Sequence, residues 1–197
     1  HLARLLGTMK DATGRVLIEG FYDDVAPLSE RESQALADLP ANDADLMHEL
    51  HFAKAEGNGK KLVELINQPS LNIRGIQSAY VGVQSQNIIP TKAEVSLDLR
   101  VVKNIDPQRQ IERLIAHVRK QGFYVTSEEP TNEEREKYPF IARVTGGPGY
   151  PASRTPMDLP VSRAVVRVVE EAMGAPIVKM PTLGGSAPMY LFENLKL

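Results

Sequence analysis

The sequence predicts a mixed α+β protein. Residues 1–145 are expected to form a two-layer domain with an antiparallel sheet and helices on one face, and residues 146–197 the C-terminal part of an α/β domain. Three observations lead to this prediction. Residues 93–102 alternate apolar and polar side chains, as a half-buried strand does. Residues 107–122 repeat apolar side chains at helical spacing, and residues 160–188 run in the order helix, strand, glycine turn, helix.

The first 69 residues are expected to form short helices joined by polar loops. Residues 2–10 predict a helix, the turn-forming residues 11–14 end it, and residues 15–19 predict a short strand. Ser29 and Glu32 have the spacing of a capping box, so we expect a helix from there to about residue 38. Two further helices are expected to end near residues 52 and 67.

Strand periodicity begins after Pro69. Residues 71–76 alternate like a strand, and residues 77–84 are expected to continue it or to pair with it. Pro107 suits the first position of the following helix, and Gly122 suits its C-terminal end. Phe123 then begins a further strand, and the charged, proline-bounded residues 127–139 are expected to form a loop.

The last fifty residues are expected to belong to a second domain. The glycine- and proline-rich residues 146–151 indicate the crossing into it. An amphipathic helix that ends at Gly174 and a strand over residues 176–180 are expected next. The apolar stripe of this helix consists of Val161, Ala164, Val165, Val168, Val169 and Ala172.

The composition excludes several classes of protein. The 197 residues carry 23 basic and 25 acidic side chains, and this balance argues against a nucleic-acid-binding protein. The absence of cysteine excludes a disulfide scaffold and any cysteine-ligated metal, and it fits the reducing cytoplasm that we expect as the location. No apolar run reaches the roughly 18 residues of a membrane span. Helical patterns at both ends, and a first residue other than Met, lead us to expect a piece of a larger protein.

The histidines and paired carboxylates do not predict a metal site. His48 and His51 lie three residues apart, which misses the spacing of a zinc protease helix, so we interpret them as surface residues. His117 is expected on the polar side of its helix. The glutamate pairs at 128–129, 133–134 and 170–171 are interpreted as solvated surface.

The segment Gly184-Gly185-Ser186-Ala187-Pro188 has two interpretations. The glycines allow close approach of the backbone to a ligand, and N–H groups at a helix start bind carboxylates or phosphates. A plain helix cap, with Ser186 as the capping residue and Pro188 in the first turn, explains the same residues. Spacing alone leaves both interpretations open.

Arg100 and Asn87 are the other candidate binding residues. Arg100 lies on the polar face of the strand at residues 93–102, and Asn87 precedes that strand by a few residues. A guanidinium on an open sheet face can hold a carboxylate through two hydrogen bonds. Asp98 lies two residues away on the same side, so a structural ion pair is the alternative for Arg100.

Taken in order along the chain, these motifs resemble a known family. Three segments resemble the lid (dimerisation) domain of a metallopeptidase family, that of carnosinase, aminoacylase and succinyl-diaminopimelate desuccinylase. They are Gly75-Ile76, Asn87-Ile88-Ile89-Pro90 and Ala93-x-x-x-Leu97-x-Leu99-Arg100-x-Val102. Upstream, Gly20-Phe21-Tyr22-Asp23-Asp24-Val25 resembles the carnosinase-type dipeptidases, and so does the Gly-Gly-Ser-x-Pro turn at residues 184–188.

The resemblance implies an enzyme in which this chain supplies only part of the active site. It implies a hydrolase with two metal ions, zinc or manganese, that cleaves the amide bond of dipeptides or N-acyl amino acids. The ligands and the catalytic Glu pair of the family match no position here, and His1 does not match the catalytic lid His. By the resemblance, Arg100 holds the substrate carboxylate or the oxyanion and is the catalytic residue of this chain. Asn87 touches the substrate from the partner subunit of a homodimer, and Gly184, Gly185 and Ser186 bind the carboxylate end.

A second class of function explains the missing ligands differently. The chain is then a non-catalytic α+β dimerisation module of a regulatory protein. Such a module has no need of the turn at residues 184–188, and that turn therefore favours the enzyme.

Overall fold

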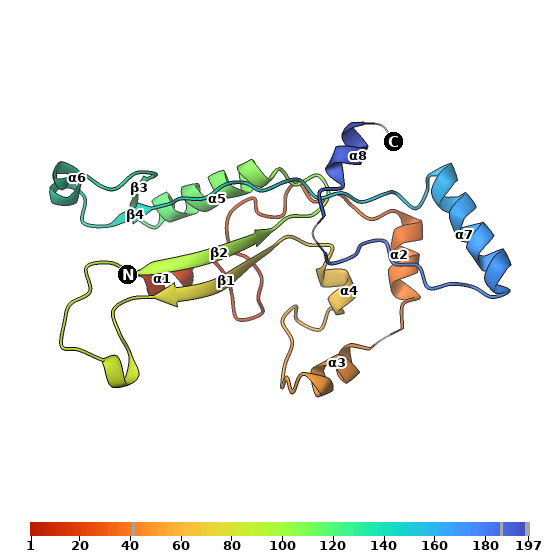
Figure 1. Cartoon of the computed structure of the whole chain (residues 1–197), viewed down its shortest axis with the longest axis horizontal. Helices are drawn as coiled ribbons and strands as arrows, with labels where there is room; N and C mark the ends of the chain where they lie inside the picture. Colours follow the sequence, from red (N-terminus) through yellow and green to blue (C-terminus); the bar gives the residue numbers. More distant parts are fainter. Residues whose placement is uncertain (41, 186, 196–197) are drawn as a thin grey trace. The chain divides into compact units, whose positions relative to one another are not determined.

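The structure is a computed structural model and describes residues 1–40, 42–185 and 187–195 (Figure 1). It is a mixed α+β structure with short sheets and several helices. The chain divides into two compact units. Unit 1 consists of His1–Phe21, Pro69–Arg100 and Pro107–Pro148, and unit 2 of Tyr22–Gln68, Val101–Asp106 and Gly149–Leu197. Residues 22–68 thus fall into the same unit as the C-terminal residues, and the division into domains at residues 145 and 146 stays a prediction.

An antiparallel ribbon of two strands lies in unit 1. Strand β1 (Ser70–Gln77) pairs with β2 (Glu94–Arg100), with Ser70 opposite Arg100 and Gln77 opposite Glu94 (Figure 1). The predicted alternation of β2 is confirmed, because its apolar side chains are half-buried and Glu94, Ser96 and Arg100 are exposed. The expected strand at residues 77–84 is wrong beyond Gln77. There the chain leaves the ribbon and forms a turn of 3₁₀ helix, η1 (Gly82–Gln84).

Helix α5 (Pro107–Lys120) follows the ribbon and agrees closely with its prediction. Gly122 has φ 89°, a conformation that favours glycine, and it turns the chain into β3 (Tyr124–Thr126). Strand β3 pairs in parallel with β4 (Ile141–Arg143). The loop expected at residues 127–139 contains a helix, α6 (Asn132–Lys137). The prediction missed its capping box, in which Thr131 and Glu134 each bind the other's backbone N–H.

The N-terminal residues of unit 1 supply much of its core. Helix α1 (Leu2–Leu6) is shorter than predicted, and in place of a strand at residues 15–19 there is one bridge between Lys10 and Val16. The side chain of Gln110 on α5 is buried and donates to the carbonyl of Phe21 at 2.9 Å, which fixes α5 to this segment. The buried apolar side chains of unit 1 are Leu5, Leu6, Met9, Val16, Ile18, Phe21, Leu71, Leu114 and Val118.

Unit 2 is made of helices joined by extended segments. Its helices are α2 (Glu30–Ala37), α3 (Asp43–Glu49), α4 (Leu62–Leu65), α7 (Pro160–Met173) and α8 (Tyr190–Asn194). Its buried apolar side chains are Ala35, Leu36, Leu39 and Ile105. The strand expected at residues 176–180 is wrong, because these residues pair with no strand in the described part of the chain. They are held by Glu170 of α7 instead.

The predicted apolar stripe of α7 forms, but this chain leaves much of it exposed. Val161, Val165 and Val168 are each more than half exposed, and α7 has no buried residue. Within the described ranges, no helix is both long enough and apolar enough to cross a membrane.

Candidate functional site

Arg100 lies at the end of β2, where its guanidinium is exposed. Residues 98 and 100 share a face of the strand, and Arg100 Nε donates to Asp98 Oδ2 at 2.7 Å. The ion pair that the sequence left as the alternative therefore forms. An exposed pair of this kind contributes at most about 1 kcal/mol. The pair consequently helps to orient the Arg100 guanidinium on the strand surface.

Asn87 lies in the loop that joins β1 to β2, residues 78–93. Ser78 Oγ donates to the carbonyl of Lys92 at 3.1 Å and closes the neck of this loop. Asn87 is exposed, as is the whole of residues 81–90. The loop begins and ends at the opposite end of the ribbon from Arg100 (Figure 1). At about 3.3 Å per residue, the length of β2 separates the two ends by roughly 20 Å. The structure therefore does not bring Asn87 and Arg100 together within one ribbon.

The glycine turn of unit 2 is exposed and follows an anchored segment. Gly184 and Gly185 are both exposed, while Ser186 lies outside the described residues. Helix α8 begins at Tyr190 with Met189 as its N-cap, so the helix starts later than predicted. Pro188 disfavours a helical conformation at Ala187, since a residue that precedes proline avoids it. The glycines thus lie in an open stretch of backbone before the helix.

Glu170 on α7 and Asn67, which follows α4, hold the segment that leads to these glycines. Glu170 on α7 accepts from Lys179 Nζ at 2.8 Å and from the N–H of Ile177 at 3.4 Å. The hydrogen bond from Lys179 lowers the pKa of Glu170. Further along, Thr182 Oγ1 donates to Asn67 Oδ1, beyond the end of α4. Neither Asn67 nor Thr182 was singled out from the sequence, and their separation of 115 residues leaves no local pattern that reveals the contact.

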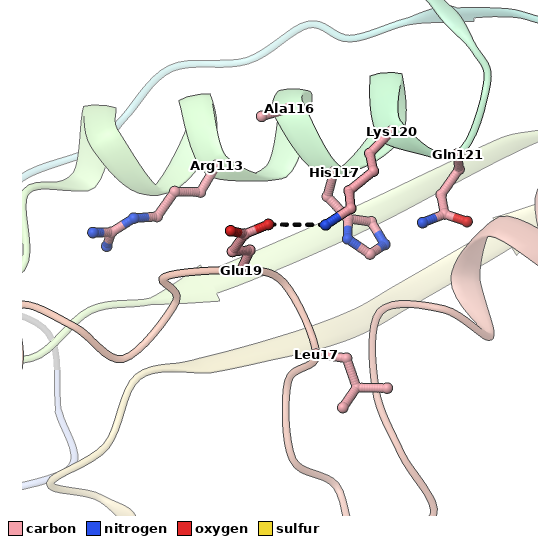
Figure 2. Close-up of a pocket in the computed structure, with 7 residues that line it drawn as sticks. All are labelled: Leu17, Glu19, Arg113, Ala116, His117, Lys120 and Gln121. Atoms are coloured by element: carbon pink, nitrogen blue, oxygen red, sulfur yellow. Dashed lines mark hydrogen bonds and ion pairs between the residues drawn. The ribbon is translucent and has the colours of Figure 1, made fainter.

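A hollow of about 350 Å³ lies between α5 and the N-terminal segment of unit 1 (Figure 2). Glu19 and Lys120 face each other across it, with Lys120 Nζ 2.9 Å from Glu19 Oε2. This hydrogen bond lowers the pKa of Glu19. The seven residues that line the hollow are Leu17, Glu19, Arg113, Ala116, His117, Lys120 and Gln121. None of the five candidate site residues is among them.

His117 corrects a prediction, because it faces inward. Its side chain is 8% exposed, and its Nε2 lies 2.9 Å from Thr8 Oγ1. Burial lowers the pKa of His117, and the positive charge of Lys120 lowers it further. The prediction failed because the N-terminal segment covers this side of α5, which the helical spacing of α5 does not reveal.

The described residues do not fit a metal centre. They contain no group of three or more His, Asp or Glu side chains placed to hold a metal ion. His48 lies in the last turn of α3, and His51 follows the helix with φ 56°. A metal ion would therefore need ligands from other residues.

Comparison with known families identifies the N-terminal three-fifths of the chain. Residues 2–124 match the family model described as the peptidase dimerisation domain of the M20 peptidases. This chain belongs to the M20 peptidase dimerisation domain family. The matched region contains the β1–β2 ribbon, α5, and the candidate residues Asn87 and Arg100.

The sequence relatives of this M20 chain include dipeptidases. It is 28% identical over 119 residues to the Cys-Gly metallodipeptidase DUG1 of Candida albicans, which covers 59% of this chain and 24% of the relative. It is 26% identical over 119 residues to the Beta-Ala-His dipeptidase of Mus musculus, with the same shares covered. The chain thus spans about a quarter of the length of the curated relatives it matches.

Solved structures extend the likeness to nearly the whole chain. The M20 family metallo-carboxypeptidase Sso-CP2 from Sulfolobus solfataricus superposes with a TM-score of 0.75 at 31% identity, over 97% of this chain and 46% of that one. Human carnosine dipeptidase 1 superposes with a TM-score of 0.70 at 19% identity, over 98% of this chain and 39% of that one. The second likeness concerns the fold alone. The M20 fold thus extends beyond residue 124 into the segment that carries Gly184 and Gly185.

Proposed function

We propose that this chain is the dimerisation and substrate-binding part of a metal-dependent peptidase that cleaves the amide bond of dipeptides or N-acyl amino acids. The observation that carries the proposal is the match of residues 2–124 to the M20 peptidase dimerisation domain. The metallodipeptidases and the metallo-carboxypeptidase among the relatives support the reaction class. The complete protein would carry zinc or manganese, with ligands from residues other than the described ones.

The geometry supports a division of labour between two subunits. Arg100 would bind the substrate carboxylate or the developing oxyanion, since a guanidinium donates several hydrogen bonds to such groups. Asn87 lies at the other end of the ribbon and would reach the active site of the partner subunit. Gly184, Gly185 and Ser186 would bind the carboxylate end of the substrate through backbone N–H groups and the Ser hydroxyl. The first of these roles makes Arg100 the catalytic residue of this chain.

Exposed apolar side chains in unit 1 support a homodimer through the lid domain. Ile73 and Ile76 of β1 are 46% and 60% exposed. Four apolar side chains of the loop at residues 78–93 are at least half exposed: Val81, Val83, Ile88 and Ile89. Burial of such side chains stabilises an interface, and pairing of β1 with its copy would satisfy open backbone groups.

The exposed face of α7 supports the assignment of residues 146–197 to part of a larger α/β catalytic domain. An amphipathic helix gains most of its stability when its apolar face is covered. In this chain that face is open. The second class considered, a non-catalytic dimerisation module, has no comparable observation in its favour.

The test is hydrolysis and assembly by the complete protein that contains this chain. Loaded with zinc or manganese, it should release the C-terminal residue from a dipeptide or the acyl group from an N-acyl amino acid, and it should sediment as a dimer. Arg100→Ala should lower kcat/KM by about 30-fold to 1,000-fold, the usual cost of one oxyanion donor. A metal-loaded dimer that hydrolyses neither substrate would favour the non-catalytic module. A monomer at every concentration would contradict the dimer.

A further inference from the structure

Asn67 is a buried amide that no step of the proposed function uses. It follows α4 directly, and its side chain is 4% exposed. A buried amide without partners costs free energy, so its two hydrogen bonds show what the side chain does. Asn67 Nδ2 donates to the carbonyl of Val63 at 2.8 Å, and Asn67 Oδ1 accepts from Thr182 Oγ1 at 2.7 Å. The amide thus connects α4 to Thr182.

Thr182 lies two residues before Gly184, so this connection reaches the glycine turn. Ile66, the neighbour of Asn67, is the nearest side chain to the position that a Cβ on Gly184 would take. A Cβ atom on Gly184 would lie 3.6 Å from Ile66 Cγ2, an ordinary van der Waals distance. The hydrogen bond to Asn67 thus supports Thr182, and Ile66 leaves room beside the backbone of Gly184.

Residues 177–184 have a second anchor, Glu170, and its position differs from that of Asn67. Glu170 holds Lys179 and the N–H of Ile177, which fixes the start of the segment. Both side chains of that ion pair are about one-third exposed, and the pair lies five residues from Gly184. The contact of Thr182 with Asn67 lies next to the glycines and ends on a buried amide. Of these two anchors, Asn67 is therefore the one nearer to the glycines.

We propose that Asn67 is a positioning residue of the substrate site. Acting through Thr182, it holds the Gly184–Gly185 backbone in place to bind the substrate carboxylate. This inference rests on the function proposed above. A group that binds the carboxylate equally before and during the reaction affects KM and leaves kcat nearly unchanged. Loss of the contact should therefore raise KM.

The experiment uses the complete metal-loaded enzyme and removes the Thr182 hydroxyl. Thr182→Val replaces the hydroxyl by a methyl group of similar size, and Thr182→Ala removes it without adding bulk. Each should raise KM for a dipeptide about tenfold, equivalent to about 1.4 kcal/mol of lost binding, with kcat within a factor of about two. Thr182→Ser keeps the hydroxyl and should restore the wild-type KM. The matched control is Ser162→Ala, which removes the bond from Ser162 Oγ to the carbonyl of Pro156 at 2.9 Å in the same unit.

The possible results separate this inference from the proposed function. An unchanged KM in both hydroxyl-free variants, with an active wild type, would overturn the inference and leave the proposed function intact. A fall in both kcat and melting temperature without a rise in KM would also overturn the inference. Loss of a bond that only stabilises the fold has this effect. A KM that rises in Thr182→Ser as much as in Thr182→Ala would overturn the inference too. A metal-loaded wild type that hydrolyses no dipeptide would instead overturn the proposed function.

Discussion

At the scale of single residues, His117 shows how one contact fixes the position of a ring proton. Thr8 Oγ1 donates its only proton to the carbonyl of Leu5 at 2.7 Å, so it can only accept from His117. Nε2 of the ring therefore carries a proton. Its pKa lies below the ordinary 6.5, chiefly because of burial and secondly because of Lys120, whose charge is partnered by Glu19. The neutral ring links α5 to the turn that follows α1.

This pKa predicts the pH dependence of stability. The unfolded chain protonates His117 near pH 6.5 and the folded chain only at lower pH, so acid favours unfolding across that interval. The contribution is fully present above pH 6.5 and is lost as the pH falls through the folded-state pKa. His117→Gln keeps a donor without a titrating group. Urea unfolding at pH 7.5 and pH 5.5 should show a larger loss of stability for the wild type than for this variant. Equal losses would contradict the assignment.

At the scale of elements, the N-terminus of α2 combines a cap with a covered ion pair. Ser29 Oγ accepts from the N–H of Glu32 at 3.3 Å, and Glu32 Oε2 accepts from the N–H of Ser29 at 2.9 Å. The other carboxylate oxygen lies 3.6 Å from Arg154 Nε, and the two side chains are 3% and 11% exposed. Arg154 also donates to the carbonyl of Pro27 at 2.9 Å. One carboxylate therefore caps the helix and binds a segment far along the chain.

Removal of this carboxylate should destabilise unit 2 strongly. Glu32→Ala loses the bond from the N–H of Ser29 and leaves a covered guanidinium without its carboxylate, for which we expect a loss of about 3 kcal/mol in the free energy of unfolding. Glu30→Ala is the matched control, because Glu30 occupies the same first turn and is exposed. It should cost less than about 0.5 kcal/mol. Thermal or urea unfolding measures both. A similar small loss in the two variants would mean that the pair with Arg154 adds nothing.

The elements differ in how far the sequence predicts them, for physical reasons. The capping box of α2, the proline start of α5 and the alternation in β2 depend on neighbours a few residues apart, and all three form as expected. Residues 15–19, 77–84 and 176–180 have strand-like composition, but a strand also needs a partner, and they pair with none beyond one bridge and the end of β1. Helix α6 was missed because its charged residues resemble a loop.

In the candidate site too, local patterns predict single residues but not the contacts between distant segments. Asn87 and Arg100 were found through motifs, and β2 explains why they lie apart. The position of Arg100 on the exposed face followed from the alternation, as did its pairing with Asp98 as an alternative. The contact between Asn67 and Thr182 depends on folding across 115 residues, and periodicity carries no information about it.

At the scale of the whole molecule, this chain should bind metal poorly when it is studied alone. The described residues offer no cluster of three ligands, and a zinc site needs three or four. We therefore expect the 197-residue chain to bind zinc with a Kd above roughly 1 μM and to have no peptidase activity. Competition with a fluorescent zinc chelator measures the affinity. Weak binding is expected if the metal ligands lie in other segments of the complete protein. Stoichiometric zinc binding with a Kd below that value would contradict the account.

The central claim is that Arg100 and Asn87 serve different active sites of one dimer, and mixed dimers test it most directly. The complete enzyme is prepared as Arg100→Ala and as Asn87→Ala, each of which should lose roughly 2–4 kcal/mol of transition-state stabilisation. After subunit exchange, a mixed dimer has one site with both groups and one site with neither. Activity should therefore partly return on mixing. If both groups acted on the same subunit's site, every mixed site would lack one of them. No return of activity, with the mixed dimers shown to have formed, would contradict the account.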